Sequence, residues 1–184
     1  MLAEPAPADR FLYLKGTWRY ARGLALAAKG RTADAEVELA ELRRTATDPA
    51  LDYPLFSPNT AAAILAIAPE VLAGDLAARR KDYDLAVAHL DRGIRLEDGL
   101  TYTEPAEWNY PVRQLLGAVL LEAGRAKEAE TVYWEDLKRN PENGWSIFGL
   151  AQALKAQGRD AAAIEERFRK AWGWGDVTLT ASRF

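Results

Sequence analysis

The sequence predicts an all-α protein, a right-handed superhelix of about four helix–turn–helix repeats closed by a C-terminal capping tail. Three observations lead to this fold class. A short turn phrase recurs along the 184 residues. Helical apolar spacing surrounds each copy of that phrase. Alanine and leucine, both strong helix formers, dominate the apolar residues.

The turn phrase occurs at residues 30–35, 81–86, 124–129 and 158–163. Each copy has a turn residue, then polar residues, then a small residue five places on. The last two copies lie 34 residues apart, which is the tetratricopeptide period, and insertions at loops or helix ends explain the other gaps of 51 and 43. We therefore predict one domain over residues 1–184, with tetratricopeptide-like repeats at approximately 11–47, 57–98, 108–141 and 143–172 and a tail at 173–184.

The third repeat shows the pattern most completely. Gly124 ends its first helix, where a left-handed residue is commonly needed, and Pro141 stops its second. Gly117 and Ala129 are small, which lets the two helices approach closely. Tyr133 lies on the second helix. These positions all match the tetratricopeptide pattern.

Two repeats depart from the pattern. In the second, Lys81 replaces the turn glycine, Ser57-Pro58 predicts a helix start, and Pro69 should kink a long helix or divide two short ones. In the fourth, Arg167 falls where a large apolar residue is expected. Phe168, one place on, is expected to fill that role.

Composition argues against several classes of partner and site. The formal net charge of −3 gives no basic field to attract nucleic acid. No cysteine is present, which excludes disulfides and zinc–thiolate sites, and a lone histidine, His89, is a poor metal ligand. We expect no cofactor and no metal. No uninterrupted apolar run reaches the roughly 18 residues that span a bilayer, and residues 1–10 do not read as a secretory signal. We expect a cytoplasmic protein with no membrane partner.

Three stretches resemble a more specific group. They are Tyr102-Thr-Glu-Pro-Ala-Glu-Trp108-Asn-Tyr-Pro-Val-Arg113, Asn140-Pro-Glu-Asn-Gly-Trp-Ser146, and the ending Ala171-Trp172 to Ala181-Ser-Arg-Phe184. Over nearly its whole length the chain resembles a family of bacterial tetratricopeptide proteins. Longer members carry a histidine-rich N-terminal half that looks like a metal site. The resemblance implies that this chain corresponds to the C-terminal half alone. No residues here match the histidine-rich half, so its metal function does not carry over.

The concave face of such a stack, lined by the first helix of each hairpin, is where peptides usually bind. We therefore predict a non-catalytic scaffold for a protein or peptide partner, not an enzyme. The alternative is a half of a larger metal-binding or enzymatic protein whose histidine-rich half is missing. Another interpretation of Trp145 and Phe148 is that they pack on the tail. Phasing on the turn residues predicts a binding face of Tyr20, Leu24, Asp75, Arg79, Gln114, Ala118, Trp145, Phe148, Gln152 and Lys155.

Two segments outside the repeats allow alternatives. In the stretch 102–113, Glu104 and Glu107 could form an acid–base pair. The favoured interpretation is a structured loop with Trp108 buried and Glu104 paired with Arg113. The tail is expected to cap the last hairpin and bury three apolar residues. Its rival role is to dock Phe184 and its carboxylate into another subunit or a partner. A homodimer formed through an open end of the repeat stack is a separate expectation. The three apolar residues are Trp172, Val177 and Leu179.

Overall fold

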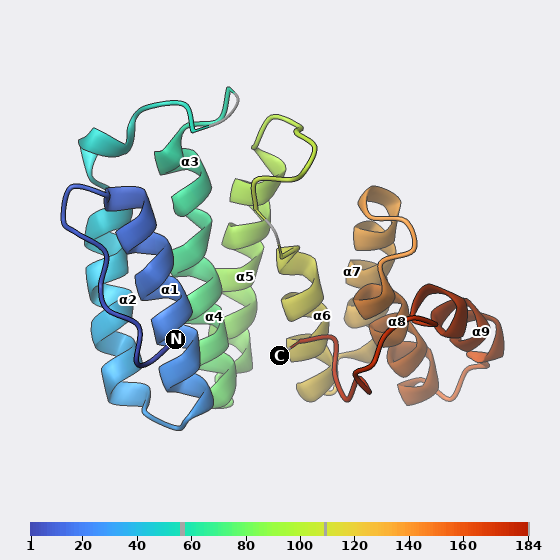
Figure 1. The fold of residues 1–184 in the computed structure, drawn as a ribbon. Helices are drawn as coiled ribbons and strands as arrows, with labels where there is room; N and C mark the ends of the chain where they lie inside the picture. The colour runs from blue at the N-terminus through green and yellow to red at the C-terminus, as the bar shows by residue number, and fades with distance from the viewer. Residues whose placement is uncertain (56–57, 109, 184) are drawn as a thin grey trace. The chain divides into compact units, whose positions relative to one another are not determined.

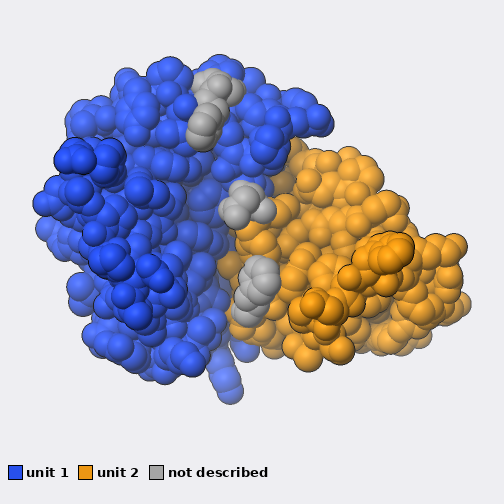
Figure 2. Space-filling view, in the orientation of Figure 1, with its two compact units in different colours: residues 1–109 blue, residues 110–184 orange. Residues whose placement is uncertain are grey.

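The computed structural model describes residues 1–55, 58–108 and 110–183 and confirms the all-α class (Figure 1). Within those ranges no β-strand occurs, and extended pairing is limited to one isolated bridge between Pro54 and Thr60. The chain divides into two compact units, residues 1–109 and 110–184 (Figure 2). The prediction of one domain remains a prediction.

Unit 1 contains two helical hairpins and a connecting segment. α1 packs against α2, and α4 packs against α5. The first helices of the two hairpins, α1 and α4, also lie against each other (Figure 1). The elements of unit 1 are α1 (Leu12–Ala28), α2 (Thr32–Ala46), the 3-10 turn η1 (Pro49–Leu51), α3 (Ala61–Leu65), α4 (Ile67–Arg79) and α5 (Tyr83–Asp98).

Unit 2 contains two further hairpins and a non-helical tail. α6 packs against α7 and α8 packs against α9, while α7 and α6 both contact α8. The helices of unit 2 are α6 (Val112–Glu122), α7 (Ala126–Arg139), α8 (Gly144–Ala156) and α9 (Ala162–Ala171).

Each hairpin turns on one left-handed residue. The backbone φ is 73° at Gly30, 63° at Lys81, 74° at Gly124 and 68° at Gly158. The N–H of the following residue then donates to a carbonyl five residues back, which satisfies an orphan carbonyl at the helix end. These four positions are the turn residues that the sequence predicted. The four closing bonds are Arg31 to Leu26 (2.9 Å), Asp82 to Ala77 (3.0 Å), Arg125 to Leu120 (2.8 Å) and Arg159 to Leu154 (3.0 Å).

Glycine allows the helices of a hairpin to approach closely. A Cβ on Gly74 would lie 2.7 Å from Leu90 Cγ, and one on Gly117 would lie 2.3 Å from Tyr133 Cζ. The Tyr133 ring is also covered from α8, where a Cβ on Gly149 would come within 2.2 Å of the same atom. Tyr133 is fully buried as a result. Its ring fills a space that only two glycines leave open.

The long apolar stretch of unit 1 is divided. α3 ends at Leu65 and α4 begins at Ile67, which places Pro69 in the first turn of α4, where a missing N–H is tolerated. Of the two predicted outcomes, a kink or a division, the structure shows the division, which falls at Ala66 and not at Pro69 itself. The predicted helix start at Ser57-Pro58 is wrong at Pro58, because the helix begins at Ala61. Thr60 is its N-cap and accepts a hydrogen bond from Ala63 N. Ser57 lies outside the described residues.

One apolar helical stretch among the described residues, Ala61–Arg79, is long and apolar enough to cross a membrane by length and composition. The expectation of no such segment overlooked it because Glu70 and Asp75 interrupt the run. In the structure 78% of the most apolar 18 residues of this stretch is buried inside the protein. Buried core helices share this length and composition, so the stretch is weak evidence for a membrane span.

The fourth hairpin departs from the other three. α2, α5 and α7 each begin at the second residue after their turn residue, whereas α9 begins at the fourth after Gly158. This delay changes the register of the second helix. Ala163, the small residue five places after the turn residue, is exposed, and Ala161 is buried instead. No residue of α9 is fully buried, although Phe168 packs on Phe148 with ring centroids 5.4 Å apart, as its predicted role requires.

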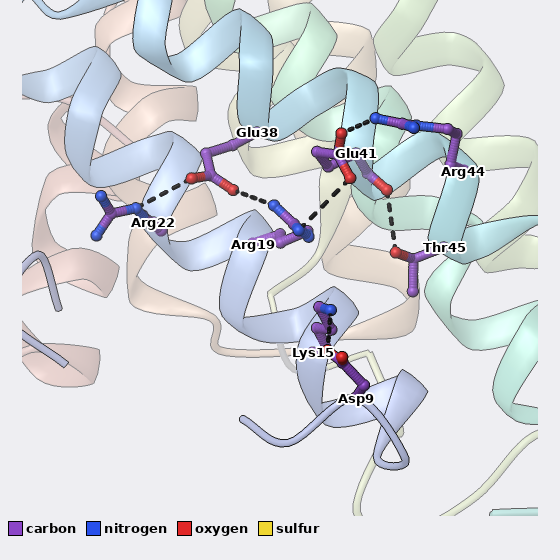
Figure 3. A network of polar contacts seen from close by, with 8 residues as sticks. All are labelled: Asp9, Lys15, Arg19, Arg22, Glu38, Glu41, Arg44 and Thr45. Carbon is purple, nitrogen blue, oxygen red and sulfur yellow. Dashed lines mark hydrogen bonds and ion pairs between the residues drawn. The ribbon is translucent and has the colours of Figure 1, made fainter. Parts of the chain in front are cut away.

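Polar contacts join the outer faces of α1 and α2 (Figure 3). Glu38 accepts hydrogen bonds from Arg19 Nη1 at 2.9 Å and from Arg22 Nε at 3.0 Å. Arg19 also lies 3.5 Å from Glu41, which pairs with Arg44. The side chain of Glu38 is only 12% exposed, so water screens its two pairs less than ordinary surface pairs. This network of ion pairs therefore adds polar contacts to the packing of α2 against α1.

Asp136 makes the corresponding polar link in unit 2. It accepts hydrogen bonds from Ser146 Oγ on α8 at 2.5 Å and from Asn140 Nδ2 at 2.9 Å. Burial raises the pKa of the Asp136 carboxyl above its usual value, against the lowering effect of these donors. The charged form is therefore the less favoured form in the folded state.

Lys81→Gly should stabilise the protein by up to about 1 kcal/mol. A lysine in the left-handed region has a steric cost that glycine avoids, partly offset by the greater freedom of glycine in the unfolded chain. Urea unfolding measures the change. Lys29→Gly is the control. Lys29 is the C-cap of α1 and has a φ of −90°, so glycine relieves no strain there and the variant should be less stable than wild type. A Lys81→Gly variant that is no more stable than wild type contradicts the turn assignment.

Gly117→Ala should lower the free energy of unfolding by about 1–3 kcal/mol, because the added methyl group collides with the buried Tyr133 ring. Thermal unfolding followed by circular dichroism measures it. Gly99→Ala is the matched control, since the nearest atoms to its added Cβ are backbone oxygens at 3.3 and 3.4 Å. Equal effects of the two substitutions would contradict the packing described for Tyr133.

Asp136→Asn should change how stability depends on pH. Because the folded pKa of Asp136 is raised, its stabilising contribution is fully present below about pH 4, where an unfolded aspartate titrates, and is lost as pH rises through the folded pKa. The stability of wild type relative to the asparagine variant should therefore fall with rising pH. Urea unfolding between pH 3.5 and 7.5 measures it. A difference that stays constant or grows with pH contradicts the assignment.

Candidate functional site

The ten residues of the predicted binding face lie on the first helices of the hairpins, divided between the two units. α1 and α4 of unit 1 carry four of them, and α6 and α8 of unit 2 carry six. Their role in binding remains a prediction. Unit 1 carries Tyr20, Leu24, Asp75 and Arg79, and unit 2 carries Gln114, Ala118, Trp145, Phe148, Gln152 and Lys155.

In unit 1 the predicted aromatic anchor already has a partner. Tyr20 is half-buried and packs on Trp108, with ring centroids 5.5 Å apart and planes inclined by 50°. Leu24, one turn further along α1, is also half-buried. The accessible part of this face therefore lies around Leu24 more than around Tyr20.

Asp75 and Arg79 form an ion pair on α4. Arg79 Nε donates to Asp75 Oδ2 at 2.6 Å, and the two side chains are 29% and 4% exposed. A carboxylate this deeply buried needs a charged partner. The pair supports the helix, and only the Arg79 guanidinium reaches the surface.

The loop after α5 is structured, as the sequence predicted. Asn59 holds it by donating to Thr101 O at 2.8 Å and to Glu107 Oε2 at 2.5 Å, while Thr101 N donates to Asn59 Oδ1 at 2.8 Å. Trp108 is buried, at 8% exposure. Burial first, and then the nearby carboxylate of Glu107, raise the pKa of Tyr13 on the adjoining α1. The loop therefore belongs to the packed body of unit 1.

The two carboxylates of this loop have separate hydrogen-bond partners. Glu107 accepts a hydrogen bond from Asn59, whereas Glu104 is exposed and accepts one from the Tyr102 hydroxyl. Their separate partners favour the structural interpretation over an acid–base role. The expected pairing of Glu104 with Arg113 remains a prediction.

In unit 2 the two predicted aromatic anchors pack against α9. Trp145 meets Trp172 edge-on with centroids 5.5 Å apart, and Phe148 meets Phe168 at 5.4 Å. Phe168 and Trp172 stack on each other at 6.0 Å. Because α9 has no fully buried residue of its own, this aromatic cluster attaches it to α8. Both residues are therefore packed, but Phe148 packs on α9 and not on the tail as the packing interpretation had it.

Two polar residues complete the α8 part of the predicted face. Gln152 is half-buried. Lys155 is exposed and forms an ion pair with Glu165 of α9. Gln152 is therefore the candidate on α8 that the aromatic cluster and the ion pairs leave accessible.

The tail does not cap only the last hairpin. Trp172 packs against Gly144 and Trp145 and donates from Nε1 to Val177 O at 2.8 Å. Leu179 is buried, at 8% exposure, as predicted. The prediction of burial was wrong for the other two residues, because Trp172 is only half-buried and Val177 is 59% exposed. Beyond this point the chain leaves α9 and runs back toward α6 (Figure 1). We name residues 176–183 the C-terminal strap.

Ser182 anchors the strap on α6 and α7. It is 2% exposed, and its hydroxyl lies 2.5 Å from the Tyr133 hydroxyl and donates to Gln114 O at 3.1 Å. Tyr110 donates to Ser182 O at 3.2 Å. The next residue, Arg183, reaches Glu122 at 2.8 Å. The strap therefore lies on Gln114, one of the predicted binding residues.

Gln114 is almost fully buried yet incompletely bonded. It is 2% exposed, and its Oε1 atom has no hydrogen-bond partner among the described residues. Buried amide oxygens are usually satisfied. Burial beneath the strap also raises the pKa of the Tyr133 hydroxyl far above its usual value, so Tyr133 stays protonated. The strap surface thus offers neutral hydrogen-bonding groups and the carboxylate of Glu122.

Sequence reasoning missed this contact. It placed Tyr133 on the second helix of the third repeat but assigned Ser182 no role, because residues outside a helix have no periodic pattern to interpret. The available signal for this contact was Ser182 and Arg183, which follow Leu179 closely in a segment otherwise without pattern.

No group of three histidine, cysteine, aspartate or glutamate residues that could hold a metal occurs within residues 1–55, 58–108 and 110–183. His89 Nδ1 instead lies 2.7 Å from Glu70, which links α5 to α4. Arg92 joins the same carboxylate at 3.1 Å.

A scan of the chain against protein-family models finds no match, and searches of curated proteins and of solved structures find no significant match either. The resemblance to bacterial tetratricopeptide proteins therefore stays a prediction from the sequence. The candidate site rests on the contacts of the two units alone.

Proposed function

We propose that this protein is a non-catalytic binding module of the tetratricopeptide type, which binds a segment of a partner protein on the first helices of its hairpins. The observation that carries the proposal is in unit 2. A non-helical segment, the C-terminal strap, lies on α6 at Gln114. Its anchor residue Ser182 also bonds Tyr133 of α7. The first-helix surface thus accommodates a chain segment without helical structure of its own.

The side chains of the predicted face fit binding better than chemistry. Arg79 is paired with Asp75, and Lys155 is paired with Glu165. Leu24 and Gln152 are half-buried, so each offers part of its surface to a ligand. Apolar and amide groups of this kind recognise peptides through packing and main-chain hydrogen bonds.

A screen of peptides displayed as a random library tests the proposal with the full chain. Selected peptides should bind with measurable affinity by isothermal titration calorimetry. Leu24→Glu should weaken the binding of peptides that contact unit 1 at least tenfold, equivalent to about 1.4 kcal/mol. Gln152→Ala should do the same for peptides that contact unit 2. Both substitutions lie on first helices, and Gln152→Ala should leave the packing of α8 nearly unchanged.

The control is Val37→Glu, a comparable change at a 60% exposed position on the second helix α2. It should leave affinity unchanged. If no peptide binds, or if the first-helix substitutions leave every selected peptide unaffected while circular dichroism stays native, the proposed function is wrong.

A further inference from the structure

The first helices of unit 1 end side by side. A Cβ added to Gly16 of α1 would meet Leu65, and one added to Gly23 would meet Leu72, so the contacts recur with the same step of seven residues in both segments. A further step of seven brings the turn after α1 beside the end of α4. Both hairpin turns accordingly lie at the lower end of unit 1 in Figure 1. We name three residues at this end the cationic edge: Lys29, Arg79 and Lys81.

Lys81 is held in a strained conformation. It has a φ of 63° at a turn position where the other three hairpins have glycine, and an L-residue has a steric cost there. Its side chain is exposed and has no ion pair or hydrogen bond with any residue that the structure describes. Attraction of one exposed cation to the end of α4 is smaller than this cost. A strained residue that no internal contact requires points to a role at the surface.

Arg79 is oriented by a buried carboxylate. Its Nε donates to Asp75 Oδ2 at 2.6 Å, and the Asp75 side chain is 4% exposed. The two Nη groups of Arg79 have no partner within residues 1–55, 58–108 and 110–183, and the side chain is 29% exposed. A guanidinium fixed through Nε presents its remaining donors in a planar fork that matches a carboxylate.

Three carboxylates near the cationic edge already have partners. Lys29, exposed at the end of α1, pairs with none of the described acids. The cationic edge therefore offers two exposed ammonium groups and one guanidinium fork. The occupied carboxylates are Asp34 with Arg31, Glu36 with Arg80, and Asp82 with the Leu85 N–H.

We propose that the cationic edge binds an acidic segment of a partner protein. Arg79 holds one carboxylate in its fork, and Lys29 and Lys81 attract others. This inference rests on the proposed function and adds the charge of the partner segment in unit 1. The formal net charge of the chain is −3, so the attraction is local to this edge. A nucleic acid fits less well, because its affinity comes from neutralising many phosphates over a broad basic surface.

Fluorescence anisotropy with the full chain and two labelled hexapeptides tests the charge requirement. One peptide has three Ser-Glu repeats and the other three Ser-Gln repeats, so they differ only in charge. The acidic peptide should bind roughly tenfold more tightly. Raising the ionic strength from about 0.01 M to about 0.15 M shortens the Debye length from about 30 Å to about 8 Å and should weaken it. Equal binding of the two peptides overturns the inference.

Lys81→Gly separates binding from stability. It relieves the strained turn, so the variant should be at least as stable as wild type, yet it should bind the acidic peptide about threefold more weakly. Adding Lys29→Gln should bring the total loss to about tenfold, because each change removes one exposed charge. Arg43→Gln is the control, since Arg43 is an exposed cation in the last turn of α2, at the opposite end of unit 1.

Two results with these variants overturn the inference. One is wild-type affinity in the double variant. The other is an equal loss in Arg43→Gln, which would indicate diffuse attraction. Tighter binding of an oligothymidylate than of the acidic peptide overturns it as well. If the acidic peptide fails while library-selected peptides bind and respond to Leu24→Glu, only the cationic edge is ruled out and the proposed function stands.

Discussion

A single left-handed residue at the end of each first helix is the constraint on which the rest of this structure depends. Gly30, Lys81, Gly124 and Gly158 all adopt it, and each is followed by the same closing hydrogen bond. The turn fixes where the second helix starts, and therefore which residues face the first. Where the distance from turn to helix changes, as after Gly158, the buried small position moves and the second helix packs differently.

Within unit 2 this geometry is used to hold one ring. Tyr133 lies against Gly117 of α6 and Gly149 of α8, so three helices meet around it. Its hydroxyl, protonated in the folded state because burial raises its pKa, is left at the edge of the core and binds Ser182. Packing of the core and attachment of the C-terminal strap thus depend on the same residue.

The part of the molecule that could be predicted is the part whose sequence pattern repeats along the chain. Turn residues, the small residue at Gly117 and an interruption of the helical run near Pro69 could be predicted because each depends on neighbours within one hairpin. The exposure of Val177 and the path of the strap could not, because Ser182 finds partners 68 and 49 residues away in a segment with no repeating pattern. The candidate site was predicted as a set of helix faces. The sequence could not indicate that many residues of these faces already have partners, in aromatic contacts, in ion pairs and in the strap.

The accessible remainder of the first-helix face is what a partner would contact. Leu24 in unit 1 and Gln152 in unit 2 retain surface of their own, whereas Gln114 is covered by the strap. Amide chemical-shift mapping of the full chain with a library-selected peptide tests this account most directly. It predicts that the perturbed amides cluster on the first helices α1, α4, α6 and α8. Perturbations confined to the second helices α2, α5, α7 and α9 would contradict it.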